Sequence, residues 1–137
     1  MSEAQGAEGG GPRGTLATQT IAMPADTNPS GDIFGGWLLS QMDLAGAVIA
    51  WESARGRIAT VAVDSMTFHL PVNVGDVVSC YGEVVRIGRT SVAVRVEAWA
   101  LRRGVDQRQR VTQGVFTYVA LGPDRRPRPI AEGPEVA

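Results

Sequence analysis

The stretch NPSGDIFGGWLLSQMDLAGAVIAWESA, residues 28–54, decides the fold. It opens with turn-forming residues and a glycine pair, Gly35 and Gly36, where the backbone can approach a neighbour or a ligand closely. The proline-free residues that follow predict a helix of about five turns, with apolar side chains over most of its circumference. A helix of this kind has to be buried on nearly all sides, so we expect other elements to wrap it.

One narrow face of this helix carries small and polar residues, and Asp43 projects from it beside Gly46 and Ala47. A carboxylate on a buried helix is costly unless it is paired, hydrogen-bonded or used in chemistry. Two interpretations remain open from the residues alone. Asp43 either meets backbone donors or an arginine and fixes the packing, or it is a reactive group in a slot left by small neighbours. We favour the second.

Composition narrows the class of protein. The chain has 137 residues and a net charge of −1, which fits one compact domain and argues against a nucleic-acid surface. With a single cysteine, Cys80, and a single histidine, His69, neither an internal disulfide nor a Cys/His metal site can form within one chain, so we expect no metal. The N-terminus lacks the pattern of a signal peptide, and residues 33–51 are too polar at their centre to span a membrane. We therefore expect a soluble, cytoplasmic protein.

The remaining residues predict strands. Residues 1–14 are rich in glycine and are expected to form a disordered tail, and residues 122–137 a flexible tail rich in proline and arginine. Between them, residues 15–121 form the predicted domain, with one strand before the helix and four after it. The expected strands span residues 15–23, 57–68, 76–87, 91–102 and 108–121. This order predicts an α+β fold, in which one antiparallel sheet curls around one helix and dimerises to cover its edge.

Six spaced residues carry a resemblance to a known family. They fit the pattern N-x-x-G-D-x-x-G-G, then six further residues, then D, and they are Asn28, Gly31, Asp32, Gly35, Gly36 and Asp43. Two further blocks, DSMTFHLPVNVGDVVSCYGEV and GRTSVAVRVEAW, extend the match. From about Met23 to Val119 the chain resembles the hotdog-fold acyl-CoA thioester hydrolases, and within them the bacterial YciA-like group.

The resemblance implies a hotdog fold, a long central helix wrapped by a curved antiparallel sheet and paired as a dimer, commonly three dimers in a hexamer. It also implies active sites at the dimer interface. Asp43 then matches the catalytic carboxylate, a general base on water or a nucleophile. Asn28 matches a loop asparagine that reaches this carboxylate from the partner subunit. Gly35 and Gly36 lie where backbone amides meet the thioester carbonyl.

Hydrolysis of a thioester needs few catalytic groups. The departing thiol has a pKa of roughly 8.5, so it leaves readily as a thiolate without a general acid. One carboxylate and an oxyanion site can therefore suffice. The start of a helix supplies unpaired N–H groups and partial positive charge for that site. No separate cofactor is expected, since coenzyme A is part of the substrate and of the product.

Substrate binding is expected at two places. The short loop Gly88, Arg89, Thr90 and Ser91 has the donors that coenzyme A phosphates need, although a plain exposed turn is the alternative. The acyl tunnel is expected to involve Met66 and Phe68, with Leu39 and Trp99 as further candidates. We expect a structural or solvent-edge role for His69, and an N-cap role for Asp32.

The sequence therefore predicts an acyl-CoA thioesterase that hydrolyses fatty acyl-CoA to free acid and coenzyme A. A non-catalytic hotdog protein that binds or senses acyl-CoA is the alternative, although a binder has no need of a costly buried carboxylate. A hydratase ranks last, because no histidine lies in or beside the helix. Self-association as a dimer and then a trimer of dimers is expected, with neither nucleic acid nor membrane as a partner.

Overall fold

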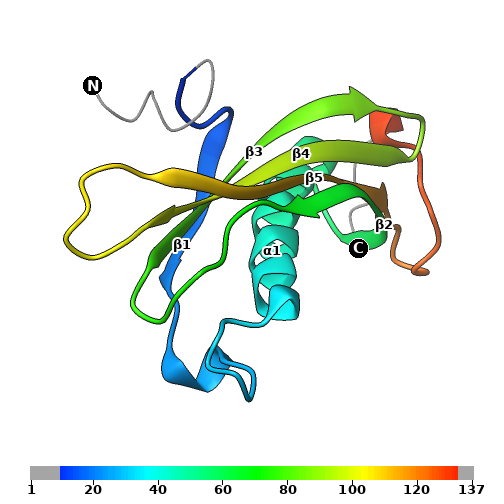
Figure 1. Ribbon diagram of the computed structural model, residues 1–137. Helices are drawn as coiled ribbons and strands as arrows, with labels where there is room; N and C mark the ends of the chain where they lie inside the picture. The colour runs from blue at the N-terminus through cyan, green and yellow to red at the C-terminus, as the bar shows by residue number, and fades with distance from the viewer. Residues whose placement is uncertain (1–9, 133–137) are drawn as a thin grey trace.

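The computed structural model describes residues 10–132 and shows one long helix lying against a curved antiparallel sheet (Figure 1). The disorder expected for residues 1–9, and the flexibility expected for residues 133–137, concern segments outside the described residues. Among residues 10–132, no helix is long and apolar enough to cross a membrane.

The predicted strands and helix are all present. Each strand agrees with its predicted bounds to within two residues at either end, and the helix begins at the glycine pair. The elements are β1 (Thr15–Ile21), η2 (Pro24–Asp26), α1 (Gly35–Ala54), β2 (Ile58–Phe68), β3 (Val77–Ile87), β4 (Ser91–Leu101), β5 (Gln109–Ala120) and η3 (Ile130–Glu132). The strand order is β1-β3-β4-β5-β2 and every pairing is antiparallel, so the α+β hotdog architecture is confirmed.

The helix is buried along one stripe only. Its buried residues follow helical spacing and pack on the sheet: Leu38, Met42, Ala45, Gly46, Ala50 and Ala54. On the opposite face Leu44, Val48 and Trp51 are 55%, 51% and 53% exposed. Burial of the helix on nearly all sides, which the sequence predicts, is therefore not reached within one chain. One curved sheet covers one side of a helix, and the apolar side chains on the other side form a patch open to a second chain.

Strand β4 is buried on both faces. Its inward valines pack in the core beneath the helix, while Glu97 and Trp99 on the outward face are 1% and 0% exposed. Glu97 accepts hydrogen bonds from Trp99 Nε1 at 2.8 Å and from the backbone N–H of Arg13 at 3.2 Å, and it pairs with Arg95. Burial acts to raise the pKa of Glu97, but these donors outweigh it and hold the pKa below its ordinary value.

The chain after β5 packs against the domain up to η3, which differs from the loose tail expected from its composition. The buried guanidinium of Arg128 donates to the carbonyl oxygens of Ala54 at 2.6 Å and Leu121 at 3.2 Å. The backbone N–H of Ile130 donates to the backbone carbonyl oxygen of Arg89 at 2.9 Å. A cation that satisfies the last carbonyls of a helix is favourable, and it ties this segment to the end of α1.

Replacing Arg128 with alanine should lower the free energy of unfolding by about 2 kcal/mol, because it leaves the Ala54 and Leu121 carbonyls without their charged donor. The measurement is urea unfolding followed by tryptophan fluorescence. The matched control is Arg126→Ala, whose side chain is exposed, and it should change stability by less than about 0.5 kcal/mol. Equal stability of the two variants would show that the tail contributes nothing.

Candidate functional site

Asp43 lies half-buried in the middle of α1, and two hydroxyl groups fix one of its carboxylate oxygens. Thr60 Oγ1 on β2 donates to Oδ1 at 2.9 Å. Tyr118 Oη on β5 lies 3.1 Å from the same oxygen and 2.9 Å from the backbone carbonyl oxygen of Asp43. Within residues 10–132 no hydrogen bond reaches Oδ2. The carboxylate is therefore held by one oxygen and presents the other.

The slot predicted beside Asp43 exists, but a tyrosine hydroxyl fills it. A Cβ added at Gly46 would overlap Tyr118 Oη and lie 3.0 Å from Cζ. Burial, and then the neighbouring Asp43 charge, raise the pKa of Tyr118 well above its ordinary value, so the hydroxyl stays a donor. Neither Thr60 nor Tyr118 was expected beside Asp43 from the sequence. The available signal was a polar aromatic residue at a core position of β5, with a glycine one helical turn after Asp43.

The start of α1 offers two free amides. Phe34 N–H donates to Asp26, and the N–H groups of Trp37 and Leu38 both donate to Phe34. Within the part of the chain that the structure describes, the N–H groups of Gly35 and Gly36 therefore have no acceptor. Both glycines are exposed, and no atom lies within 4 Å of a Cβ built on Gly36. Two adjacent N–H groups at the positive end of a helix can bind a developing oxyanion.

Asn28 organises the loop before the helix. Its Oδ1 accepts the backbone N–H groups of Ser30 at 2.9 Å and Asp32 at 3.1 Å, which leaves the Nδ2 group as a donor. Asp32 is not the helix cap that the sequence analysis expected. The N-cap residue is Phe34, with no side-chain cap, because the loop places Asp32 in the turn that Asn28 closes.

Asp43 and the free amides lie apart on the same helix. Asp43 is seven positions after Gly36, so their Cα atoms lie about 10 Å apart along the helix axis. A water molecule and a thioester carbonyl would have to lie between the carboxylate and the amides for these groups to act on one substrate.

An apolar cavity of about 190 Å³ lies at the start of α1. It is lined by Ile33, Phe34, Gly35, Leu38, Phe68, Leu70, Pro71 and Val72. The ring of Phe68 would lie 3.7 Å from a Cβ on Gly35, so the structure brings these two predicted residues together. Met66 instead packs over Gly114 of β5, and Trp99 lies on the opposite face of the sheet with Glu97, away from this cavity.

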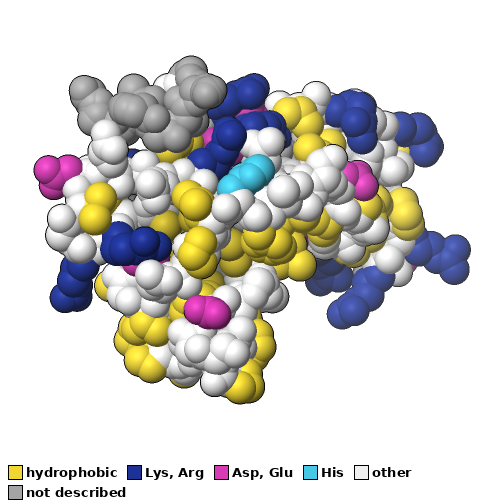
Figure 2. All heavy atoms as spheres, in the orientation of Figure 1, with side chains coloured by type: hydrophobic (Ala, Val, Ile, Leu, Met, Phe, Trp, Pro, Cys, Tyr) yellow, Lys and Arg dark blue, Asp and Glu magenta, His cyan; other side chains and the backbone are white. Residues whose placement is uncertain are grey.

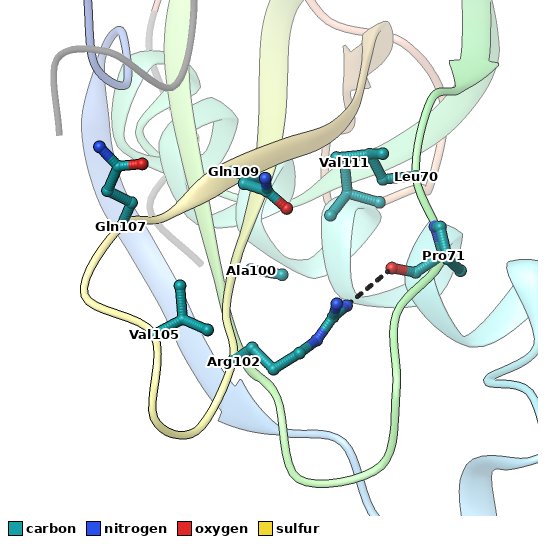
Figure 3. Close-up of a pocket in the computed structure, with 8 residues that line it drawn as sticks. All are labelled: Leu70, Pro71, Ala100, Arg102, Val105, Gln107, Gln109 and Val111. Atoms are coloured by element: carbon teal, nitrogen blue, oxygen red, sulfur yellow. Dashed lines mark hydrogen bonds between the residues drawn. The ribbon is translucent and has the colours of Figure 1, made fainter.

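A second cavity of about 180 Å³ shares Leu70 and Pro71 with the first and extends under the β4–β5 loop (Figure 3). Arg102 points into it, and its guanidinium donates to Asp76 at 3.2 Å and to the Pro71 carbonyl at 3.5 Å. Because Asp76 neutralises this arginine, the cavity is a poorer site for a phosphate than an exposed arginine would provide.

The loop Gly88–Ser91 is a tight β3–β4 turn, closed by a 2.8 Å hydrogen bond from Gly88 N–H to Ser91 O. Arg89 and Thr90 form its tip, and their backbone carbonyls accept Ile130 N–H and Ala120 N–H. The backbone is therefore fixed while the Arg89 side chain is exposed. Arginine side chains lie at both ends of the molecule in this view (Figure 2).

The other titratable candidates stand apart from Asp43. His69 is exposed after β2, as expected for a residue at the solvent edge. Cys80 is buried, and burial raises the pKa of its thiol to about 11, which makes it a poor nucleophile. Within residues 10–132 no three His, Cys, Asp or Glu side chains are grouped as a metal would require.

Comparison with known proteins finds a family profile and close relatives that match this chain. A profile described as the Thioesterase superfamily matches residues 30–106. The acyl-CoA thioester hydrolase YciA of Salmonella typhimurium is 52% identical over 122 residues, covering 87% of this chain and 92% of that protein.

Two solved structures are also similar to this chain. One is the Asp-to-Ala mutant of a hexameric, broad-specificity acyl-coenzyme A thioesterase, 49% identical with a TM-score of 0.83, and the match covers 86% of this chain and 87% of that one. The other is a hexameric hotdog-fold thioesterase of Campylobacter jejuni, 45% identical with a TM-score of 0.82, with 87% and 92% covered.

Proposed function

Because the chain belongs to the Thioesterase superfamily, and within it to the hotdog-fold acyl-CoA thioester hydrolases, we propose that it hydrolyses fatty acyl-CoA by a carboxylate mechanism at Asp43. The mechanism rests on one observation, that only one oxygen of the Asp43 carboxylate is hydrogen-bonded within the described residues. Thr60 and Tyr118 fix Oδ1, and Oδ2 remains available to a water molecule.

In this mechanism Asp43 Oδ2 takes a proton from water while the water oxygen attacks the thioester carbonyl carbon. The carbonyl oxygen becomes an oxyanion, which accepts hydrogen bonds from the Gly35 and Gly36 amides and from Asn28 Nδ2 of a second subunit. The carbon–sulfur bond then breaks, and coenzyme A leaves as a thiolate. Every group in this step is water, substrate or protein, so the proposal includes no cofactor.

The proposed mechanism includes assembly of the site from more than one subunit. One chain holds its carboxylate and its first-turn amides about 10 Å apart, and we propose that Asn28 of a second subunit completes each site. The exposed patch of Leu44, Val48 and Trp51 is the kind of surface that self-association covers. We propose a dimer as the catalytic unit and a trimer of dimers as the full assembly, as the similar thioesterases described above are hexameric.

The two ends of the substrate fit two regions of the molecule. The cavity beside Gly35 has apolar walls that include Phe68, and we propose it for the acyl chain. Met66 lies on the same strand but packs over Gly114 and does not line this cavity. The exposed Arg89 on its fixed turn, with the donors of Gly88, Thr90 and Ser91, is proposed for the coenzyme A phosphates. A cytoplasmic location, supported by the single unpaired Cys80, belongs to the same proposal.

Replacing Asp43 with asparagine should lower thiol release by at least about a hundredfold, because the amide cannot accept the proton from water. Thiol release is measured on short, medium and long acyl-CoA esters, with the wild type beside the variant. Full activity in Asp43→Asn would overturn the mechanism. Tight acyl-CoA binding without release by the wild type would instead indicate a binding protein.

Mixing two inactive variants tests the shared site. In a dimer of one Asp43→Asn chain and one Asn28→Ala chain, one site carries both changes and the other carries neither. Random pairing makes half of the dimers mixed, so co-refolded variants should recover about a quarter of the wild-type activity. The control is each variant refolded alone. No recovery, with mixed dimers shown by mass spectrometry, would place both residues in the same subunit's site.

Replacing Arg89 with alanine should raise the KM for acyl-CoA severalfold at low salt, because a phosphate loses its cation, and the difference should shrink as salt is added. The matched control is Arg103→Ala, an exposed arginine in the loop at the other end of β4. If the two variants have the same KM at every salt concentration, the Gly88–Ser91 loop is an ordinary turn.

A further inference from the structure

We propose that Tyr118 is a positioning residue for the Asp43 carboxylate, an inference that rests on the function proposed above for Asp43. Its hydroxyl lies 3.1 Å from Oδ1 and 2.9 Å from the Asp43 backbone carbonyl oxygen. One group on the sheet therefore contacts both the side chain and the main chain of the reactive residue.

The two hydroxyls that contact Asp43 come from different kinds of strand. Thr60 is exposed and lies on β2, which pairs only with β5 within residues 10–132 and shifts register between Thr60 and Ala62. Tyr118 is fully buried on β5, which pairs with β4 on one side and β2 on the other. The tyrosine hydroxyl is thus the contact held from a rigid position, and it limits rotation of the carboxylate.

The helix contains a glycine that the Tyr118 side chain explains, with its hydroxyl as the nearest atom. A glycine inside a helix costs about 1 kcal/mol relative to alanine. At Gly46 alanine would overlap Tyr118 Oη and crowd the ring, with Cζ at 3.0 Å and Cε1 at 3.2 Å. A phenylalanine at position 118 would fill the core without a polar group to satisfy. The chain instead combines a tyrosine with a glycine, and the hydroxyl they bring to Asp43 has no other partner among the described residues.

The test compares Tyr118→Phe with wild type in steady-state thiol release. Removing the hydroxyl should lower kcat about tenfold and leave KM unchanged, since the aromatic ring and the substrate contacts remain. In the Asp43→Asn background the same change should have no further effect on kcat. The matched control is Tyr81→Phe, whose hydroxyl accepts from Arg108 at 2.9 Å and which should keep wild-type kcat.

A purely structural role for Tyr118 predicts a different pattern. Loss of packing would lower activity in both backgrounds by the same factor, or would leave kcat unchanged while lowering stability. Either result overturns the proposal. Gly46→Ala provides a second variant, because its Cβ should displace the hydroxyl and lower kcat as Tyr118→Phe does. In the Tyr118→Phe background Gly46→Ala should not lower kcat further, and an additional loss would count against the proposal.

A crystal structure of Tyr118→Phe gives an answer that does not depend on activity. We expect the Asp43 carboxylate to turn away from its wild-type position or to occupy two conformers. A carboxylate unchanged in position and order would overturn the inference even if the enzyme is active. Absence of thiol release from the wild type would overturn the proposed function instead, and the crystal structure would still decide whether Tyr118 positions the carboxylate.

Discussion

The packing of the Tyr118 hydroxyl against Gly46 sets the distance between helix and sheet, and the rest of the site depends on that distance. Small residues along the same stripe of α1, including Ala45, Ala50 and Ala54, keep the helix close to the valines of β4 along its length. With the helix at this height, a hydroxyl on β5 and another on β2 reach the same carboxylate oxygen. The core packing of an otherwise apolar interface thus also orients the polar group that the chemistry uses.

A single helix supplies two different electrostatic resources. Its first turn provides free amides at Gly35 and Gly36, and its middle provides a carboxylate about two turns later. An α-helix is too straight to bring these together, and placing Asp43 nearer the amides would let their positive charge attract it and weaken the oxyanion site. In the mechanism proposed above, this spacing on one helix keeps the Asp43 carboxylate apart from the amides that would bind the oxyanion.

The sequence was sufficient for the fold and for part of the site. Alternation and turn residues located each strand because these patterns are local, and the spaced motif identified Asp43, Asn28 and the glycine pair. Thr60 and Tyr118 could not be placed beside Asp43, because they lie 17 and 75 residues away in sequence and strand register is not a local property. The bulges in β2 shift that register further.

Two other differences have the same physical origin. A helical wheel shows that Leu44, Val48 and Trp51 need cover, but it does not show whether the cover is the same chain or another. Composition likewise suggested a loose tail, since proline and arginine are common in such segments. It could not show that Arg128 meets the final carbonyls of α1, a contact set by the fold as a whole.

The strand order has a consequence for the timing of assembly. β2 directly follows the helix, yet its partner within the described residues is β5, the last strand of the chain. Both hydroxyls that hold Asp43 therefore depend on a pairing between segments far apart in sequence, and such pairings form slowly. During synthesis the helix emerges long before the strand that orders its carboxylate. The reactive geometry is thus among the last features of the molecule to form, and a partly made chain holds Asp43 without the contacts that prepare it for chemistry.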